Sequence, residues 1–200
     1  DTIGLTVHDR PYARISGLNC WEHQMMLPSY ALAAQGTQIH IAAWPGKESG
    51  APDEPVSVWT RQLLLSRAFA SQAGAYVIAA GGVRLQEHVP ERYLELCSRE
   101  HTGDSYIIDP RGEIIAGPGK GETILIAKGS MEAVLAAKMG ADIGGHYSRP
   151  DQLQLYMDGQ PLRRFRQSQE SFNDITGLNS EQVLHDKESP RLDEPLRVAG

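Results

Sequence analysis

The sequence Gly17-Leu18-Asn19-Cys20-Trp21-Glu22-His23 places one cysteine directly after an apolar run and before a stretch typical of a helix. Residues 13–18 alternate between apolar and polar side chains, which predicts a strand that ends at Cys20. Residues 28–35 predict a helix that stops at Gly36, and its proline lies in the first turn, where the missing N–H costs little. Cys20 is therefore expected on a strand-to-helix turn. Backbone N–H groups at the start of a helix favour a negative charge, here a thiolate.

Cys20 admits a structural interpretation as well as a catalytic one, because most cysteines are buried and inert. Ionisable side chains next to it, Glu22 and His23, favour a nucleophile. A cysteine nucleophile needs a base or a lowered pKa, and donors for the negative charge that develops. The second cysteine, Cys97, falls in a predicted helix and is expected to be structural. Both thiols are expected to be free, as in a reducing cytoplasm.

The bulk composition excludes several classes of function. The chain has 200 residues, 40% of them hydrophobic and 22% charged, which is typical of one globular domain. A formal net charge of −6 argues against a nucleic-acid partner. No apolar run approaches the ~20 residues needed to cross a membrane. The seven histidines show no metal-ligand spacing, so no metal is expected, and His40 is expected to be a structural histidine within a strand.

The wider pattern predicts a layered α/β domain over residues 1–157 and a polar tail over residues 158–200, expected to be disordered or to serve oligomerisation. The predicted strands cover residues 3–8, 13–18, 38–43, 75–80, 123–127 and 152–156, with a hairpin of residues 105–109 and 113–116. The predicted helices cover residues 28–35, 56–74, 91–97 and 131–139. Ser130 is expected to cap the last helix. The buried stripe of the long helix is predicted as Val58, Leu64, Leu65, Ala68 and Ala73.

Three segments carry a resemblance to a known family. Residues 17–45, 105–118 and 145–151 occur in the order typical of the nitrilase branch of the carbon–nitrogen hydrolases, and Cys-Trp-Glu-His is typical of that branch. The resemblance implies a four-layer αββα sandwich, with the N-terminal part of the fold upstream of Asp1. It also implies a catalytic glutamate, lysine and cysteine, of which only the cysteine maps here, onto Cys20. Residues 1–19 contain neither lysine nor glutamate.

The resemblance implies roles for further residues near Cys20. The backbone N–H of Trp21 would stabilise the developing negative charge, and Glu22 would support the site. The residues implied to line the substrate pocket are Gln24, Met25, Trp44 and Pro45. No metal and no cofactor is implied.

The implied reaction converts an organic nitrile to a carboxylic acid and ammonia through a thioimidate and a thioester on the cysteine. A cyanide-converting enzyme or an amidase of the same superfamily is an alternative, and so is a non-catalytic remnant that acts as an assembly module. The resemblance further implies a cytoplasmic homo-oligomer, either a dimer or a spiral. Residues 1–200 alone are expected to be inactive, because two of the three catalytic groups are not found.

Overall fold

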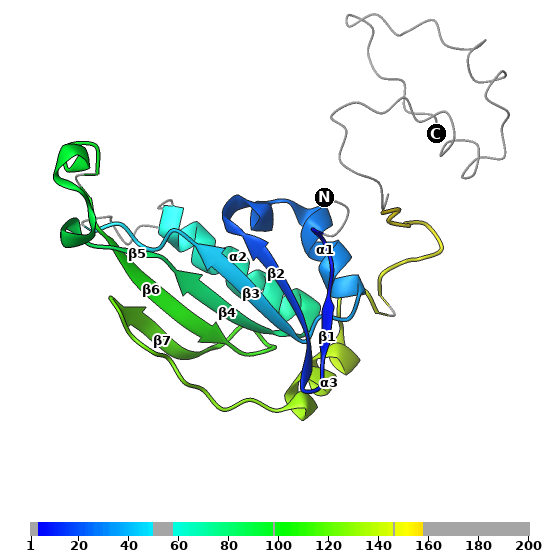
Figure 1. The fold of residues 1–200 in the computed structure, drawn as a ribbon. Helices are drawn as coiled ribbons and strands as arrows, with labels where there is room; N and C mark the ends of the chain where they lie inside the picture. Colours follow the sequence, from blue (N-terminus) through cyan, green and yellow to red (C-terminus); the bar gives the residue numbers. More distant parts are fainter. Residues whose placement is uncertain (1–3, 50–57, 98, 146, 158–200) are drawn as a thin grey trace, which may run out of the picture. The chain divides into compact units, whose positions relative to one another are not determined.

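The computed structural model describes residues 4–49, 58–97, 99–145 and 147–157, all within one compact unit, Asp1–Gly159. The tail predicted for residues 158–200 lies outside the described residues, and so does His146 of the segment 145–151. The described part is a mixed sheet with helices packed on it, which confirms the predicted α/β class (Figure 1).

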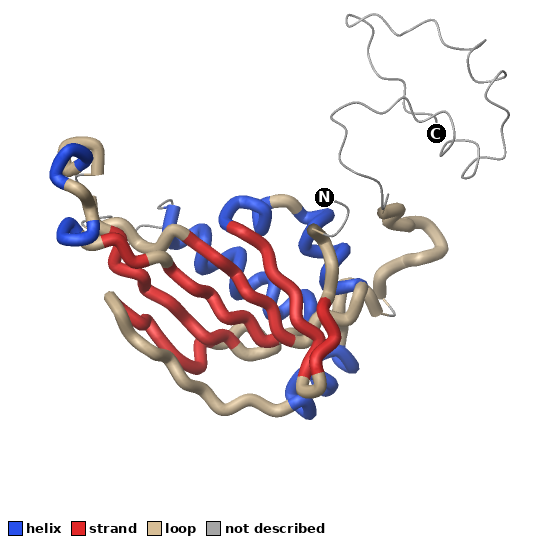
Figure 2. Tube along the Cα trace, viewed as in Figure 1, coloured by secondary structure: helices blue, strands red, loops and turns tan. Residues whose placement is uncertain are grey.

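Seven strands form the sheet in the order β1-β2-β3-β4-β6-β5, with β7 also paired to β6. Neighbours β2, β3 and β4 run parallel, whereas the pairs β1–β2, β4–β6 and β6–β7 are antiparallel. The strands are β1 (His8–Arg10), β2 (Ala13–Asn19), β3 (Ile39–Trp44), β4 (Tyr76–Gly81), β5 (Val83–Arg84), β6 (His101–Ile108) and β7 (Ile114–Lys120). Figure 2 shows β1 and β7 at opposite edges of the sheet.

The described residues also form three α-helices and three short 3-10 helices, of which the last in the chain follows the last strand. They are η1 (Cys20–Gln24), α1 (Met26–Ala34), α2 (Val58–Ala73), η2 (Gln86–His88), η3 (Glu91–Tyr93) and α3 (Met131–Gly140). Helix α2 lies along one face of the sheet, behind β3 and β4 in Figure 1. Lys138 of α3 donates from Nζ to the Ala73 carbonyl at 2.6 Å, which fastens α3 to the end of α2.

The two faces of the sheet differ in burial. On β3, His40, Ala42 and Trp44 point toward α2 and are buried, and the alternate residues are only half-buried. On β4, Val77 is fully buried on the helix side, and its neighbour Ile78 on the other side remains 39% exposed. The described residues thus build one sheet and one helical layer, two of the four layers that the resemblance implies.

The local predictions around Cys20 are confirmed. Strand β2 ends at Asn19, and α1 ends at Ala34, two residues before Gly36, whose φ of +83° suits only glycine. The hairpin is present as β6 and β7. Ser130 accepts a hydrogen bond from the Ala133 N–H at 3.2 Å and caps α3.

Four strand or helix predictions are wrong or too long. Residues 4–5 form a turn, so the first strand starts only at His8. Residues 123–127 and 152–156 form no strand, and Ile124 is 87% exposed. The helix predicted for residues 91–97 is the single 3-10 turn η3 followed by further turns. Alternation of side chains predicts a strand only where a neighbouring strand can pair with it.

The apolar stripe predicted for α2 is only partly buried, with Leu65 and Ala68 half-buried. Val58 and Leu64 are 54% and 62% exposed, and of the predicted five only Ala73 is fully buried. The buried residues are Trp59, Gln62, Ser66, Phe69, Ala70 and Ala73. Their spacing of three or four residues follows the helical period, but two of them are polar. Ser66 can be buried because its hydroxyl donates a hydrogen bond to the Gln62 carbonyl at 3.0 Å. A prediction based only on apolar residues does not detect such a buried polar residue.

Candidate active site

Cys20 lies immediately after β2, at the carboxyl edge of the parallel strands β2 and β3. In open α/β sheets this edge is where ligands bind. The backbone of Cys20 has a φ of +47°, in the left-handed region that non-glycine residues rarely adopt. Such a conformation costs on the order of 1–3 kcal/mol and persists only where the surroundings hold it. Figure 1 shows the chain reversing at the top of β2 into the short helix η1.

Glu22 holds the start of this turn. Its carboxylate oxygen Oε2 accepts a hydrogen bond from the Asn19 N–H at 2.7 Å, across the ends of the cysteine turn. The Met25 N–H in turn donates to the Glu22 carbonyl at 3.1 Å, which closes η1. The Glu22 side chain is therefore bound to the backbone of Asn19, the residue before Cys20, whereas Trp21 is the residue after it. This arrangement matches that of a capping side chain.

Two tryptophans stand beside the turn. Trp21 and Trp44 pack edge to face with ring centroids 6.3 Å apart, and the Arg61 guanidinium lies 5.2 Å from the centre of the Trp21 ring. Trp44 is buried at the end of β3, and its Nε1–H donates to Ser66 Oγ at 2.9 Å. The interaction ties the turn to α2, so the positions of Cys20 and Trp21 depend on the long helix as well as on the sheet.

A chain of polar side chains runs beneath Cys20. His23 Nδ1 lies 2.9 Å from the Cys20 carbonyl oxygen, and His23 Nε2 lies 3.0 Å from His40 Nε2. His40 Nδ1 lies 2.8 Å from Ser16 Oγ, which is 3.0 Å from Thr37 Oγ1. His40, Thr37 and Ser16 are at most 3% exposed. The expectation that His40 is a structural histidine with satisfied hydrogen bonds is confirmed.

Both rings are neutral at pH 7. Burial lowers the pKa of His23, although its hydrogen bond to Cys20 and the charge of Glu22 oppose the change. Burial and the neighbouring His23 ring lower the pKa of His40 to about 3. His40 also stacks on Phe69 with ring centroids 3.9 Å apart, and His23 packs on Trp44 at 4.6 Å. The rings are thus held in one orientation.

The sequence did not single out His23 and His40 as a pair. They are 17 residues apart and lie on different elements, and only the β2–β3 register brings them together. One signal was available: His40 shares its face of the strand with Ala42 and Trp44, so it had to be buried with a partner.

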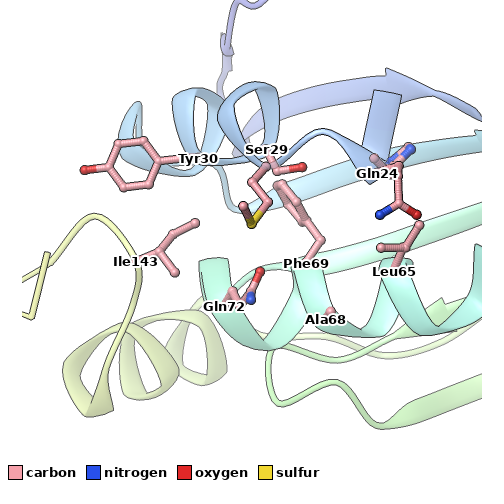
Figure 3. Close-up of a pocket in the computed structure, with 10 residues that line it drawn as sticks. Gln24, Ser29, Tyr30, Leu65, Ala68, Phe69, Gln72 and Ile143 are labelled. Atoms are coloured by element: carbon pink, nitrogen blue, oxygen red, sulfur yellow. The ribbon is translucent and has the colours of Figure 1, made fainter. Parts of the chain in front are cut away.

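A cavity of about 400 Å³ lies between α1 and α2 (Figure 3). Among the predicted pocket residues only Gln24 lines it, and Met25, 53% exposed, does not. The remaining lining residues are His23, Met26, Ser29, Tyr30, Leu65, Ala68, Phe69, Gln72 and Ile143. Cys20 and Trp21 do not line this cavity, but the lining residue His23 contacts the Cys20 carbonyl oxygen at 2.9 Å.

The other predicted pocket residues, Trp44 and Pro45, lie at the end of β3, on the same sheet edge as Cys20. The Pro45 carbonyl accepts a hydrogen bond from His101 Nδ1 at 2.8 Å. Within the described residues, no group of three His, Cys, Asp or Glu side chains is arranged to hold a metal ion. None of the helices described is long and apolar enough to cross a membrane.

Comparison with known proteins decides the family. The model of the carbon-nitrogen hydrolase family matches residues 1–139. The chain belongs to the carbon–nitrogen hydrolase family. This carbon–nitrogen hydrolase is 49% identical over 160 residues to "Nitrilase 2" of an unknown prokaryotic organism, an alignment that covers 79% of this chain and 48% of that protein. It is 35% identical over 161 residues to an aliphatic nitrilase of Rhodococcus rhodochrous, with 76% and 43% covered. The predicted resemblance to the nitrilase branch is confirmed by these relatives.

Solved structures agree with the fold. Nit3 of Saccharomyces cerevisiae, a member of branch 10 of the nitrilase superfamily, matches 74% of this chain and 47% of its own, with 20% identity and a TM-score of 0.54. A carbon-nitrogen hydrolase from Helicobacter pylori G27 matches 64% of this chain and 44% of its own, with 19% identity and a TM-score of 0.51. The chain spans about half the length of the curated relatives that it matches.

Proposed function

We propose that this carbon–nitrogen hydrolase is a nitrilase that converts organic nitriles to carboxylic acids and ammonia, with Cys20 as its nucleophile. The observation that carries the proposal is the placement of Cys20. It follows β2 at the carboxyl edge of the sheet, with a φ of +47°, in a chain 49% identical to a nitrilase. Strained backbone held by its surroundings is concentrated at active sites.

The reaction balances as a double hydrolysis. The Cys20 sulfur bonds to the nitrile carbon, the thiol proton leaves to a base, and the nitrile nitrogen takes up a proton, which gives a thioimidate. Water then adds to the same carbon, the carbon–nitrogen bond breaks, ammonia leaves, and a thioester remains. A second water releases the acid and restores the thiol. Trp21 donates its backbone N–H to the atom on which negative charge develops in each addition.

Glu22 supports the site without being the base. Its carboxylate is already bound to the Asn19 N–H at 2.7 Å, where it stabilises the turn. We assign the general base and the charge-stabilising lysine to a glutamate and a lysine that have no counterpart in residues 1–19. General-base catalysis contributes roughly 10²–10⁴-fold, and a charge-stabilising donor about 10²–10³-fold. Residues 1–200 alone are therefore expected to release little or no ammonia.

Substrate binding and assembly complete the proposal. Trp44 and Pro45, at the same sheet edge as Cys20, and Gln24 and Met25 on the helical side are proposed to contact the nitrile. A homo-oligomer, either a dimer or a spiral, is proposed from the resemblance to the nitrilase branch. Two free thiols support a cytoplasmic location. No cofactor is required, since the reaction consumes only water.

The test uses protein expressed from its complete reading frame. Ammonia and acid are measured from benzonitrile, propionitrile and cyanide, and from the matching amides. Acid and ammonia from the organic nitriles support the proposal. Turnover of cyanide alone identifies a cyanide-converting enzyme, and turnover of amides alone identifies an amidase. Absence of turnover on the whole panel, by protein that is folded, leaves the assembly module as the function and contradicts the proposal.

A further inference from the structure

The hydrogen bonds among the buried polar side chains beneath Cys20 have donor and acceptor roles that can be assigned. The Cys20 carbonyl oxygen can only accept a hydrogen bond, so His23 Nδ1, at 2.9 Å, must carry a hydrogen. Since the His23 ring is neutral, its Nε2 carries none and can only accept. His40 Nε2, at 3.0 Å, is therefore the donor in the contact between the two rings.

The same logic fixes the rest of the chain. A neutral His40 with its hydrogen on Nε2 has a bare Nδ1, so Ser16 Oγ, at 2.8 Å, donates to it. Thr37 Oγ1 lies 3.0 Å from Ser16 Oγ and 2.7 Å from the Leu32 carbonyl, and its one hydroxyl hydrogen can be donated to only one of these two acceptors. The links from Ser16 through His40 and His23 therefore all donate toward the Cys20 carbonyl. Aligned hydrogen bonds of this kind polarise and strengthen one another.

The last link controls a group that the proposed reaction uses. The Cys20 carbonyl and the Trp21 N–H belong to one planar trans peptide unit, in which the two groups point in opposite directions. Fixing the carbonyl with His23 therefore fixes the direction of the Trp21 N–H. The left-handed conformation of Cys20, with its φ of +47°, leaves this peptide in need of such a restraint.

We propose that His23 and His40 are positioning residues, whose one-way hydrogen-bond chain holds the Cys20–Trp21 peptide so that the Trp21 N–H faces the developing negative charge. This rests on the proposed function, in which that N–H is a donor. Neither ring touches the substrate, and neither exchanges a proton in the reaction. Packing of His40 on Phe69 and of His23 on Trp44 keeps both rings in the orientation that the chain requires.

The activity test compares two substitutions of His23 in protein from the complete reading frame. His23→Leu removes the donor, and His23→Asn keeps an N–H donor at the position of Nδ1. We expect His23→Leu to lower kcat about 10- to 100-fold with KM nearly unchanged, because the lost contact matters only in the transition state. His23→Asn is expected to regain most of that loss. Val134→Ala, a fully buried change on α3, is the control for destabilisation alone.

The structural test needs no turnover. Nitrogen NMR of ¹⁵N-histidine-labelled protein at pH 7 is expected to show the His23 hydrogen on Nδ1 and the His40 hydrogen on Nε2. The opposite tautomers, or a kcat of His23→Leu equal to that of Val134→Ala in an active enzyme, would overturn the positioning role. If the wild type shows no turnover but has the expected tautomers, the proposed function is overturned. The hydrogen bonds would then be a purely structural feature.

Discussion

The two cysteines of this chain are both half-buried, yet their surroundings differ in almost every other respect. Cys20 follows β2, which is paired on both sides, has left-handed backbone, and contacts His23, which in turn contacts His40. Cys97 lies outside the sheet in a run of turns, where its N–H donates to the Tyr93 and Leu94 carbonyls and its neighbour Leu96 is 83% exposed. Exposure alone does not separate the two thiols. The backbone conformation at each cysteine distinguishes them.

The largest expected difference between the two regions is in activity. Cys20→Ala is expected to abolish nitrile hydrolysis, since no other group can form the covalent intermediate. Cys97→Ala is expected to keep kcat/KM within about twofold of the wild type, because surface substitutions away from a site have small effects. Ammonia release by the two variants, with circular dichroism to show that both are folded, is the measurement. Equal losses of ammonia release in both variants would contradict the assignment of Cys20 as the nucleophile.

Alkylation compares the thiols without a substrate. With limiting iodoacetamide, Cys20 is expected to be modified at least about tenfold faster than Cys97, because Cys20 lies on a strained turn at the sheet edge where ligands bind. Peptide mapping by mass spectrometry gives the two rates from one sample. The same treatment in urea serves as the control, in which the rates should become equal. Faster labelling of Cys97 in the folded protein would contradict the assignment.

The histidine beneath Cys20 predicts a pH-dependent stability. The pKa of His40 is about 3 in the folded protein and ~6.5 in the unfolded chain, so below pH 6.5 only the unfolded chain binds this proton. Stability is therefore complete above pH 6.5 and is lost as the pH falls toward 3. Between pH 6.5 and 5 the loss from His40 is about 2 kcal/mol, at 1.36 kcal/mol per unit.

Urea unfolding at pH 7.5 and pH 5 tests this value. The variant His40→Gln is expected to be less stable at pH 7.5 but to lose less stability on acidification. Val134→Ala, a fully buried apolar change on α3, provides the control, since it removes no ionisable group and should keep the full pH dependence of the wild type. An unchanged pH dependence in His40→Gln would show that folding does not lower the pKa of this ring.

The smallest expected difference concerns the caps of the two regions. Glu22→Ala removes the hydrogen bond to the Asn19 N–H and is expected to lower the free energy of unfolding by about 0.5–2 kcal/mol, as other capping losses do. Glu91→Ala, in the first turn of η3 near Cys97, is expected to change it by less than about 0.5 kcal/mol. Glu22→Gln keeps an acceptor oxygen and should recover most of the loss. Equal effects of the two alanine variants, measured by urea unfolding, would contradict the capping role.

Local and non-local features of the structure differ in how well the sequence predicts them. The strand, turn and helix around Cys20 depend on local signals: alternation before it, Pro28 and Gly36 after it. The strands predicted at residues 123–127 and 152–156 depended on a partner that local alternation cannot reveal, and the described residues form no strand there.

The candidate site shows the same limit. The nucleophile and its turn were predicted because they are contiguous in the chain. The His23–His40 contact depends on the register that places Ser16 opposite His40, which is a non-local property. The cavity between α1 and α2 was missed for the same reason, since its lining comes from η1, both helices and Ile143.

The central claim is that Cys20 forms the covalent intermediate of a nitrilase. Rapid-quench mass spectrometry of protein from the complete reading frame, mixed with benzonitrile and digested, tests it most directly. A thioimidate or thioester mass is expected on the peptide that contains Cys20, formed and consumed at the rate of turnover. Turnover without any such adduct, or an adduct on Cys97 instead, would contradict it.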